Sequence, residues 1–473
     1  MEKILSNIND FMYSYLLIII LVVGGLYFTL RSGLVQFRFF GDQIKMVGEK
    51  PDKSDTDGKG KKKVSSFQAL MVSTASRVGT GNIIGVSTAI CVGGFGSVFW
   101  MWVIALIGAA SAFVESTLAQ IYKKRAPDGT SYGGPAYYIE GGLGLRPLAI
   151  IFSILLIVTY GFGFNMLASY NLQSTFSSYS FYDVNITPWI IGGIIALAVG
   201  YCLFGGGSRV LRVTGVLVPA MGVAYVIVAL VIVVMNITSM PSIFGRIFSE
   251  AFDVKAIFGG FGGSCLMYGV KRGLFSNEAG VGSAPNASAA AEVSHPVKQG
   301  LVQVLSVFID TILVCSATAF MCLGSGVEPT PEMSGAPYVQ ESLSTTLGTF
   351  GPIFITVSMM LFAFTTLLGN LYYVNQAFSH ILGRVPTKKF MYVYYVIASL
   401  IIFVGAGLSA DVLWSIADIT MGLMTIINMP VIAILSEQAF RALKDYVKQK
   451  KAGKNPVFKA ENISLKNKTD YWS

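Results

Sequence analysis

The chain has 473 residues, of which 53% are hydrophobic and only 12% are charged. A soluble domain carries about 25% charged residues, so this composition excludes an ordinary soluble protein and predicts a polytopic helical membrane protein surrounded by lipid. The formal net charge of +9 does not indicate a nucleic-acid partner. Most Lys and Arg residues lie in loops and tails beside apolar segments, where such residues orient a membrane protein.

The sequence offers no constellation for catalysis. It contains no phosphate-binding loop, metalloprotease motif or serine-hydrolase motif, and its only histidines are His295 and His380. We therefore expect neither an enzyme nor an ATP-driven transporter, and no organic cofactor. The cysteines are interpreted as small packing residues, since they show no metal-ligand spacing; they are Cys91, Cys202, Cys265, Cys315 and Cys322.

Eleven apolar segments are long enough to cross a membrane as helices. The first is interpreted as a retained helix rather than a signal peptide, because its apolar run is long and no basic cluster precedes it. The predicted fold class is therefore an all-α polytopic membrane protein with 11 transmembrane helices. In chain order the segments cover residues 11–30, 66–92, 97–122, 147–178, 188–204, 213–235, 256–283, 299–323, 351–380, 390–407 and 411–436.

Lys and Arg residues gather in every second connection. They fill the loop 31–63, follow the third, fifth, seventh and ninth segments, and recur in the tail after the eleventh. The intervening connections are nearly free of them, with Arg246 and Lys255 as the main exceptions. The positive-inside rule then places the N-terminus outside and the C-terminus in the cytoplasm, with the chain in the plasma (inner) membrane.

Two of the apolar segments carry residues that a membrane helix rarely contains. A charge at the centre of such a helix costs at least ~2.5 kcal/mol, and glycines weaken it further. Helices interrupted in this way expose backbone groups to a cavity. We therefore predict discontinuous helices at 66–92 and 256–283. The supporting runs are RVGTGNIIGVS (Arg77–Ser87) and KRGLFSNEAGVGS (Lys271–Ser283), in which Arg77, Asn82, Gly85 and Val86 align with Arg272, Asn277, Gly280 and Val281.

The two interrupted segments run in opposite directions under the topology derived from charge. Setting the first segment aside leaves ten, and an interrupted segment begins each group of five. This pattern predicts a 5+5 inverted repeat. The predicted domains are a leading transmembrane helix with a basic cytoplasmic loop (1–63), a first five-helix repeat (64–236), a second five-helix repeat (237–436) and a cytoplasmic tail (437–473). Residues 448–473 of this tail are expected to be partly disordered.

The run GLFSNEAGVGSAPNASAA (Gly273–Ala290), together with VGTGNIIGV in the first interrupted segment, resembles the signature of the alanine or glycine:cation symporter family. Eleven spans with a solitary leading helix also fit that family. The resemblance implies the leucine-transporter-like fold of the APC superfamily. It also implies sodium as the coupling ion, small neutral amino acids (chiefly alanine and glycine) as substrates, alternating access, and function as a monomer.

An amino acid zwitterion needs hydrogen-bond donors for its carboxylate and acceptors for its ammonium group, and broken helices supply both. In the first segment we expect the N–H groups of Thr80, Gly81 and Asn82 to bind the carboxylate. In the second we expect the carbonyls of Gly273, Leu274 and Phe275 to bind the ammonium group, with Phe275 covering the pocket. Further candidate substrate contacts are Gln173, Ser276, Asn277 and Glu278.

The alternative interpretation of both segments is a Gly-rich helix-packing surface. That interpretation leaves the charges and the Asn residues at this depth unexplained.

The resemblance implies a sodium site between the first broken segment and the ninth span. The candidate ligands are Ala75, Val78, Phe362, Thr365 and Thr366. The alternative for the Thr pair is that its hydroxyl groups bond to the backbone of their own helix. Asn82 matches a residue that holds a second sodium in some relatives.

A buried charge network is predicted from Arg77, Glu115, Arg272 and Asp310, because charges inside a membrane seek partners. Asp310 is expected either to join a second cation site or to pair with Lys271 or Arg272. Two other functions stay open at this point. One is a proton-coupled transporter in which Glu115, Glu278 or Asp310 titrates. The other is an ion channel, which the inverted pair disfavours, since channel filters are usually symmetric rings.

Overall fold

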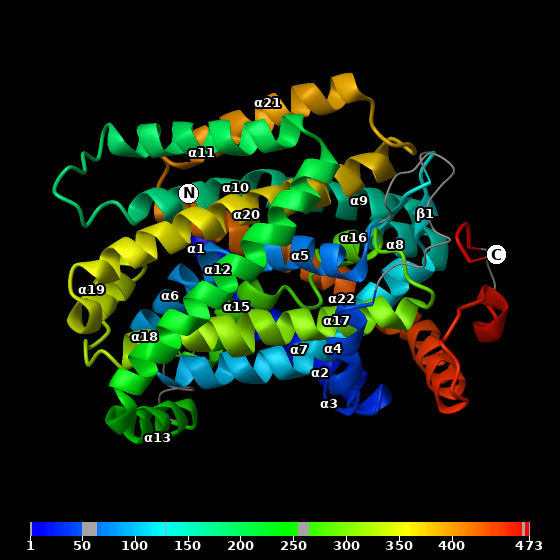
Figure 1. Ribbon diagram of the computed structural model, residues 1–473, viewed down its shortest axis with the longest axis horizontal. Helices are drawn as coiled ribbons and strands as arrows, with labels where there is room; N and C mark the ends of the chain where they lie inside the picture. Colours follow the sequence, from blue (N-terminus) through cyan, green and yellow to red (C-terminus); the bar gives the residue numbers. More distant parts are fainter. Residues whose placement is uncertain (1, 50–63, 128, 254–263, 466–468, 473) are drawn as a thin grey trace.

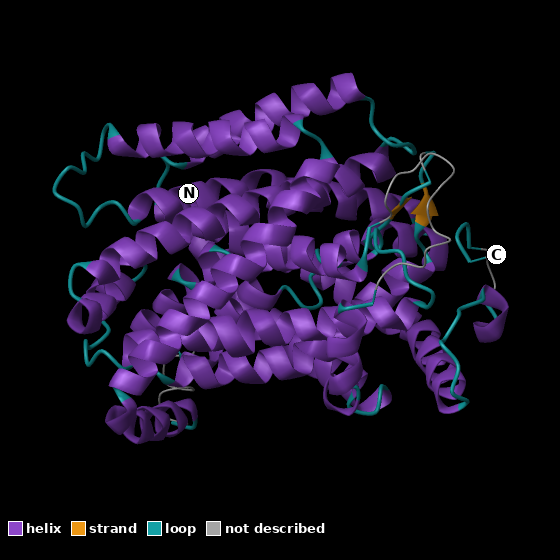
Figure 2. Ribbon diagram, in the orientation of Figure 1, coloured by secondary structure: helices purple, strands orange, loops and turns teal. Residues whose placement is uncertain are grey.

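The computed structural model describes residues 2–49, 64–127, 129–253, 264–465 and 469–472. Long helices lie side by side along one direction, and the C-terminus lies at one end of the bundle (Figure 1). Helices dominate the described residues (Figure 2). Two short strands, β1 (Lys124–Arg125) and β2 (Ser131–Tyr132), pair antiparallel at the end that carries the C-terminus.

Nine helical stretches in the described part of the chain are long and apolar enough to span a membrane. Each matches one of the predicted segments. The two predicted segments without such a match are 66–92 and 256–283, the ones expected to be interrupted. The nine stretches are Leu5–Arg31, Gly96–Ile121, Arg146–Ser174, Thr187–Phe204, Gly207–Met235, Pro296–Leu323, Phe350–Ile381, Lys388–Gly405 and Ala410–Lys451.

The elements before residue 236 fall into a leading helix, a first broken segment and the helices that follow it. Several long helices contain a π-helical turn, which bends the helix locally. In chain order the helical elements of this part are α1 (Glu2–Phe11), a π turn (Met12–Leu16), α2 (Leu17–Arg31), α3 (Val35–Arg38), α4 (Phe40–Val47), α5 (Ser66–Arg77), a 3₁₀ turn (Thr80–Asn82), α6 (Ile84–Gly93), α7 (Gly96–Ile121), α8 (Pro135–Leu143), α9 (Arg146–Leu156), a π turn (Ile157–Gly163), α10 (Phe164–Ser174), α11 (Thr187–Phe204) and α12 (Gly207–Met235).

The second broken segment follows a short surface helix. The later elements are a 3₁₀ turn (Ile237–Ser239), α13 (Met240–Ala251), α15 (Cys265–Asn277), α16 (Pro285–Ser288), α17 (Pro296–Val307), a π turn (Phe308–Cys315), α18 (Ser316–Leu323), a 3₁₀ turn (Pro331–Met333), α19 (Ala336–Leu347), α20 (Phe350–Ile381), α21 (Lys388–Gly405), α22 (Ala410–Lys451) and a 3₁₀ turn (Ala460–Ile463).

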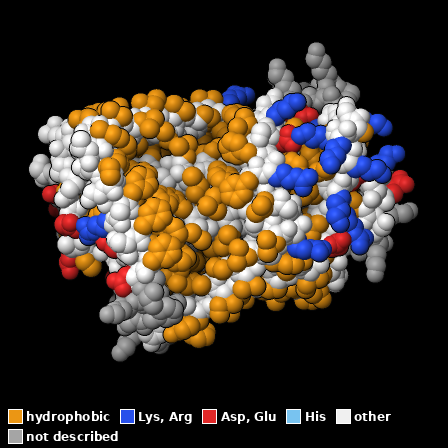
Figure 3. All heavy atoms as spheres, turned by 90° about the horizontal axis from the view of Figure 1, so that it is seen from below, with side chains coloured by type: hydrophobic (Ala, Val, Ile, Leu, Met, Phe, Trp, Pro, Cys, Tyr) orange, Lys and Arg blue, Asp and Glu red, His pale blue; other side chains and the backbone are white. Residues whose placement is uncertain are grey.

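The surface carries a broad apolar belt, and Lys and Arg side chains gather at one end of the molecule (Figure 3). Large apolar side chains on α11, α12 and α21 point outward, among them Leu197, Val216 and Val396. A soluble protein would not expose so continuous an apolar surface. The belt therefore identifies a multi-pass membrane protein, as the composition predicted.

The broken segments lie in the centre of the bundle, where α15 packs against α6 and α7. Glycines allow this close approach, as is common between membrane helices. A Cβ atom at Gly269 would lie 2.6 Å from the Ser97 carbonyl oxygen, and one at Gly273 would lie 3.3 Å from Met101 Cα. Gly273 is therefore a packing residue against α7.

The C-terminal region differs from the prediction in two ways. Helix α22 continues to Lys451, so the predicted boundary at residue 436 falls inside a continuous helix. The described part of the tail is packed rather than disordered. Trp472 Nε1 donates to the Gln120 carbonyl at 2.7 Å, and Phe458 N donates to the Ser294 carbonyl at 2.9 Å.

Candidate functional site

The first break separates α5 from α6. In a continuous helix the Gly79 N–H would bond to the Ala75 carbonyl, but it donates instead to Asn82 Oδ1 at 2.8 Å. The N–H groups of Thr80 and Gly81 have no acceptor among the described residues. The Asn82 N–H is not free for the substrate carboxylate as expected, because it donates to the Gly79 carbonyl at 3.2 Å and closes the 3₁₀ turn. Two free donors therefore remain at the start of the half-helix.

Close approach of other elements explains the glycines in this break. A Cβ atom at Gly81 would lie 2.7 Å from the Phe275 ring of α15, and one at Gly79 would overlap the Thr366 hydroxyl of α20. A side chain at either position would push these elements apart. The first break is thus in direct contact with the second broken segment and with α20.

The second break lies later than the sequence predicted. Helix α15 continues to Asn277, and the Leu274 carbonyl accepts from Glu278 N at 2.9 Å. Gly273, Leu274 and Phe275 are therefore helical, and the Leu274 carbonyl is not free for the ammonium group as expected. The helix ends because Glu278 adopts a left-handed conformation with φ 52°, followed by Gly280 at 86° and Gly282 at 88°.

Residues from α7 and α22 anchor the second break. Glu115 Oε2 accepts from the Gly282 N–H at 3.1 Å and from Asn428 Nδ2 at 3.0 Å. The same Asn428 amide also donates to the Gly280 carbonyl at 3.0 Å. Glu115 therefore satisfies backbone and amide groups of the irregular segment.

The two breaks meet around a small buried cavity, called the central cavity below. Its volume is about 10 Å³, which is at most the room needed for one water molecule. It unites six predicted site residues with four further ones. The predicted members are Thr80, Gly81, Phe275, Glu278, Thr366 and Arg77 of the charge network, and the others are Ser76, Gly79, Phe164 and Leu167.

Asn82 and Ser276 do not line this cavity, because their side chains turn toward Asp310. Asn82 Nδ2 donates to Asp310 Oδ1 at 2.7 Å, and Ser276 Oγ donates to Asp310 Oδ2. Thr311 and Cys315 complete this polar cluster. The expected pairing of Asp310 with Lys271 or Arg272 is wrong, since both of those cations bind Asp418.

Two other candidate substrate contacts also lie outside the central cavity. Gln173 lines a separate, larger cavity, where its Oε1 accepts from the Tyr182 hydroxyl at 2.9 Å. Asn277 caps the backbone at the end of α15, with its Oδ1 accepting from Ala279 N at 3.0 Å. Both side chains are therefore engaged with neighbouring parts of the chain.

The Thr pair on α20 divides into two environments. Thr365 Oγ1 donates to the carbonyl of Leu361 or Phe362, at 3.0 and 3.1 Å. Thr366 Oγ1 is buried, faces the first break and has no hydrogen-bond partner within the described ranges. An orphaned buried oxygen of this kind suits a ligand. The Ala75 and Val78 carbonyls lie at the adjacent end of α5, beyond which the regular helical bonds stop.

Three buried carboxyl groups and one buried guanidinium lie around the central cavity. The Arg77 guanidinium interacts electrostatically with Glu115, Glu278 and Asp310. Its Nε and Nη2 atoms have no hydrogen-bond partner among the described residues. Such a site gains stability from an added cation, because buried like charges repel strongly in a low-dielectric interior.

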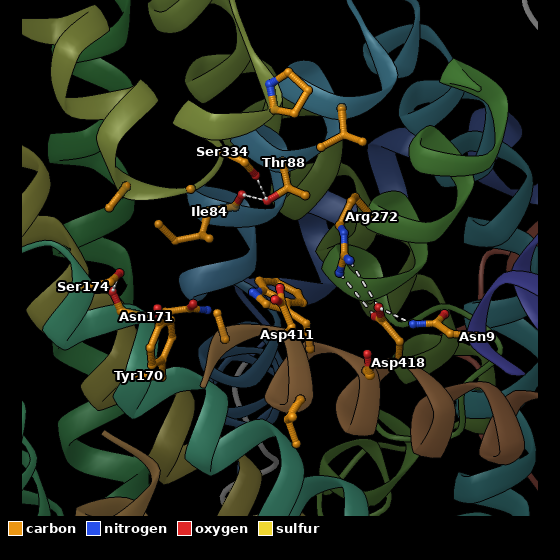
Figure 4. A pocket seen from close by; sticks show the side chains of 18 of the residues that line it. Asn9, Ile84, Thr88, Tyr170, Asn171, Ser174, Arg272, Ser334, Asp411 and Asp418 are labelled. Atoms are coloured by element: carbon orange, nitrogen blue, oxygen red, sulfur yellow. Dashed lines mark hydrogen bonds and ion pairs between the residues drawn. The ribbon is translucent and has the colours of Figure 1, made fainter. Parts of the chain in front are cut away.

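A second cavity of about 800 Å³ lies next to the central one and is called the outer cavity below. Figure 4 shows Arg272, Asp418 and Asn9 together at its wall. Arg272 lies 4.2 Å from the centre of the Trp414 ring. The Trp414 ring in turn packs on Phe275, with ring centres 4.9 Å apart. Since Phe275 also borders the central cavity, these three side chains separate the two cavities.

Several residues of the site escaped the sequence analysis. Asp418 carries the ion pairs with Lys271 and Arg272, and Asn171 Nδ2 donates to Thr80 Oγ1 at 3.1 Å. Asp418 had a usable signal, because it is a carboxylate inside an apolar segment, and the cations at 271 and 272 needed a partner. Asn171 and Trp414 had none, since only long-range packing brings them to the site.

Comparison with known proteins agrees with this geometry. The model of the sodium:alanine symporter family matches residues 1–460. The amino-acid carrier protein AlsT of Bacillus subtilis (strain 168) is 43% identical over 461 residues, covering 97% of this chain and 95% of AlsT. The probable sodium/glutamine symporter GlnT of the same organism is 41% identical over 475 residues, covering 100% of this chain and 96% of GlnT.

Among solved structures, MhsT in complex with L-phenylalanine superposes with a TM-score of 0.53 at 12% identity, covering 85% of this chain and 92% of MhsT. That likeness confirms the predicted leucine-transporter-like fold. The chain belongs to the sodium:alanine symporter family.

Proposed function

We propose that the protein is a sodium-coupled symporter that takes up small neutral amino acids, alanine and glycine, across the plasma membrane by alternating access. The observation that carries this proposal is the meeting of the two helix breaks at the central cavity. There, the free N–H groups of Thr80 and Gly81 lie on the same cavity as the Glu278 carboxylate. Donors and an acceptor for a zwitterion are thus brought to one place.

The substrate is held between the breaks. Its carboxylate accepts hydrogen bonds from Thr80 and Gly81 at the positive end of the half-helix. Its ammonium group binds Glu278, whose charge is otherwise buried. The aromatic and aliphatic walls formed by Phe164, Leu167 and Phe275 close the cavity to about 10 Å³, so they must move apart before any amino acid fits. A small substrate needs the least movement, which supports alanine or glycine over glutamine, the substrate in the name of GlnT.

Sodium binds between the first break and α20. The proposed ligands are the carbonyls of Ala75 and Val78 with the Thr366 hydroxyl, joined by Phe362 and Thr365 from the same face of α20. Oxygen ligands of this kind suit hard cations. The excess of buried carboxylate around Arg77 attracts the ion. Sodium binding favours the state that accepts substrate from outside, so the sodium gradient drives uptake.

Alternating access requires two halves that move relative to each other. We propose eleven transmembrane helices, counting the two broken segments with the nine continuous spans, arranged as a leading helix and a 5+5 inverted repeat. The basic end with the C-terminus faces the cytoplasm, which places the N-terminus and the outer cavity on the external side. Substrate then reaches the central cavity from the outer one.

The test is uptake of labelled alanine into proteoliposomes. An inward sodium gradient should drive accumulation, whereas an equal potassium gradient should not. Unlabelled glycine should compete, and glutamine should compete poorly. Sodium-independent uptake driven by a proton gradient would reject the ion assignment, and stronger competition by glutamine than by alanine would reject the substrate assignment.

Proton coupling is the second candidate, and Asp310 is the observation that favours it. This buried carboxylate has hydroxyl and amide partners but no ion pair among the described residues. In that case Asp310→Asn would abolish proton co-flux and leave sodium-dependent binding of alanine intact. Absence of any proton flux in the wild-type protein would dispose of this candidate.

A further inference from the structure

Asp418 of α22 collects hydrogen bonds from two other parts of the chain. Arg272 of α15 binds it through both terminal nitrogens, with Nη1 at 3.2 Å from Oδ1 and Nη2 at 3.1 Å from Oδ2. Lys271 Nζ lies 3.1 Å from Oδ2. The side chains are almost fully buried, with exposed fractions of 7% for Lys271, 4% for Arg272 and 1% for Asp418. A buried ion cluster of this kind is stable only when its geometry is held tightly.

The second part is the leading helix. Asn9 Nδ2 donates to Asp418 Oδ2 at 3.3 Å, and the Tyr13 hydroxyl donates to the Asp418 carbonyl at 3.1 Å. These two residues lie one turn apart on the same face of the helix. The Tyr13 ring also faces Lys271, with Nζ 5.2 Å from the ring centre. The leading helix therefore contacts both signs of charge in the cluster.

Local structure brings the leading helix this close. Tyr13 lies in the π turn Met12–Leu16, the irregular part of the helix, and π turns recur at functional positions. On the other side, Gly422 of α22 lacks a side chain where Met12 and Leu17 approach it. The leading helix and α22 can therefore approach each other closely near Asp418.

The ion cluster lies at the boundary between the two cavities. Asp418, Lys271 and Arg272 line the outer cavity together with Asn9 (Figure 4). Arg272 lies over Trp414, and Trp414 packs on Phe275, which borders the central cavity. The position of Asp418 thus determines the position of Arg272, and through it that of the aromatic pair that closes the central cavity.

We call Arg272, Trp414 and Phe275, the side chains that separate the two cavities, the outer barrier, and we call it closed when they are arranged as in this structure. We infer that the leading helix contributes to this barrier. Asn9 and Tyr13 are positioning residues that hold Asp418 where it keeps the barrier closed. The inference rests on the proposed function, because it takes the outer cavity as the external entrance. Loss of the hydrogen bonds from Asn9 or Tyr13 lowers the fraction of molecules with a closed barrier. The apparent dissociation constant of the substrate rises as that fraction falls. Sodium does not need the barrier closed, so its affinity does not weaken.

The competing interpretation is that the leading helix merely packs along α22. Tyr27 provides the matched control. It lies in the same leading helix, and its hydroxyl lies 3.4 Å from Ser436 Oγ of the same partner helix. Tyr27→Phe removes a hydrogen bond between the same two helices far from Asp418. A packing role predicts equal effects of Tyr13→Phe and Tyr27→Phe, whereas a positioning role predicts that they differ.

The experiment compares sodium-dependent binding of labelled alanine by purified wild-type protein, Tyr13→Phe, Asn9→Leu and Tyr27→Phe, with the melting temperature of each. We expect Tyr13→Phe and Asn9→Leu to raise the alanine dissociation constant about two- to tenfold, the range for loss of one hydrogen bond. The sodium concentration for half-maximal binding should not rise. Tyr27→Phe should leave both values unchanged.

The outcomes that contradict the role of the leading helix differ from those that contradict the proposed function. Equal alanine affinity in Tyr13→Phe, Tyr27→Phe and wild type would overturn the role of the leading helix while leaving the proposed function in place. A change in melting temperature without a change in affinity would overturn it as well. Wild-type protein that binds no alanine in sodium would instead reject the proposed function.

Discussion

The Thr366 hydroxyl of α20 occupies the space that a side chain at Gly79 would need. This contact joins the first helix break to α20 at the point where the Ala75 carbonyl loses its helical partner, since the Gly79 N–H donates to Asn82 instead. Thr366 Oγ1 itself has no partner among the described residues. One buried hydroxyl thus lies beside the open end of α5, which supports the proposed cation site.

Thr366→Val should therefore weaken sodium binding. The change keeps the volume of the side chain and removes one oxygen ligand, so we expect the sodium concentration for half-maximal alanine uptake to rise at least about tenfold, as for loss of one interaction with a charge. The control is Thr425→Val, because the Thr425 hydroxyl bonds to its own helix at Met421. Unchanged sodium dependence in Thr366→Val would show that the ion binds elsewhere.

Gly81→Val should abolish alanine binding without preventing folding. The new side chain would stand where the Phe275 ring lies, since even a Cβ atom comes within 2.7 Å of it. Gly222→Val is the matched control, because a Cβ atom at Gly222 meets no atom within 4 Å. Binding of labelled alanine to purified protein measures the effect. Wild-type affinity in Gly81→Val would remove the first break from the substrate site.

Substitutions of Glu278 and Glu115 should have different effects on uptake and on melting temperature, although both residues are buried carboxylates. We expect Glu278→Gln to abolish alanine uptake with a small change in melting temperature, because Glu278 faces the central cavity. Glu115→Ala should instead lower the melting temperature, since it strands the Gly282 N–H and the Asn428 amide at about 1–3 kcal/mol each. Full uptake by Glu278→Gln would contradict its role in binding the ammonium group.

The packed tail should contribute to stability. Trp472 is 9% exposed and donates to the Gln120 carbonyl at 2.7 Å, so Trp472→Ala should lower the free energy of unfolding by up to about 3 kcal/mol. Lys454→Ala, at an exposed position in the same tail, should have no effect. Thermal unfolding in detergent measures both, and equal melting temperatures would mean that the tail packs without stabilising the fold.

His295 should make the end of the molecule that carries the C-terminus sensitive to acid. Burial lowers the pKa of His295 below its usual value, and the hydrogen bond with Asp445 offsets this only in part. A folded-state pKa below the unfolded value of about 6.5 means that stability is complete above that pH and falls as the pH drops through it. Protonation also removes the acceptor at Nδ1 for the Val297 N–H. Melting temperature should fall below pH ~6.5 more steeply in wild type than in His295→Asn; equal slopes would contradict this.

The sequence located the two broken segments because charges and glycines inside apolar runs are costly and therefore informative. It did not locate the end of α15 within the second segment, since the carbonyls of 273–275 were expected to be free, whereas Gly273 is helical and packs α15 against α7. The actual end depends on a left-handed Glu278, which no local pattern predicts. Within the central cavity, Thr80, Gly81, Phe275, Glu278 and Thr366 were predictable from the two motifs.

Residues that act through long-range packing were not predictable in the same way. Gln173 was predicted to contact the substrate, but it lines the outer cavity rather than the central one. The side chains of Asn82 and Ser276 could hydrogen-bond to an amino acid substrate, but both donate to Asp310 instead. Trp414 and Asn171 come from distant parts of the chain, and only the assembled bundle brings them to the site.

Coupling between the two breaks is tested most directly by the movement of sodium itself. Proteoliposomes with equal sodium on both sides are given alanine outside, and entry of labelled sodium is followed. We predict that the alanine gradient drives labelled sodium inward, and that Gly81→Val and Thr366→Val abolish this flux. Alanine accumulation without any accompanying sodium entry would contradict the account.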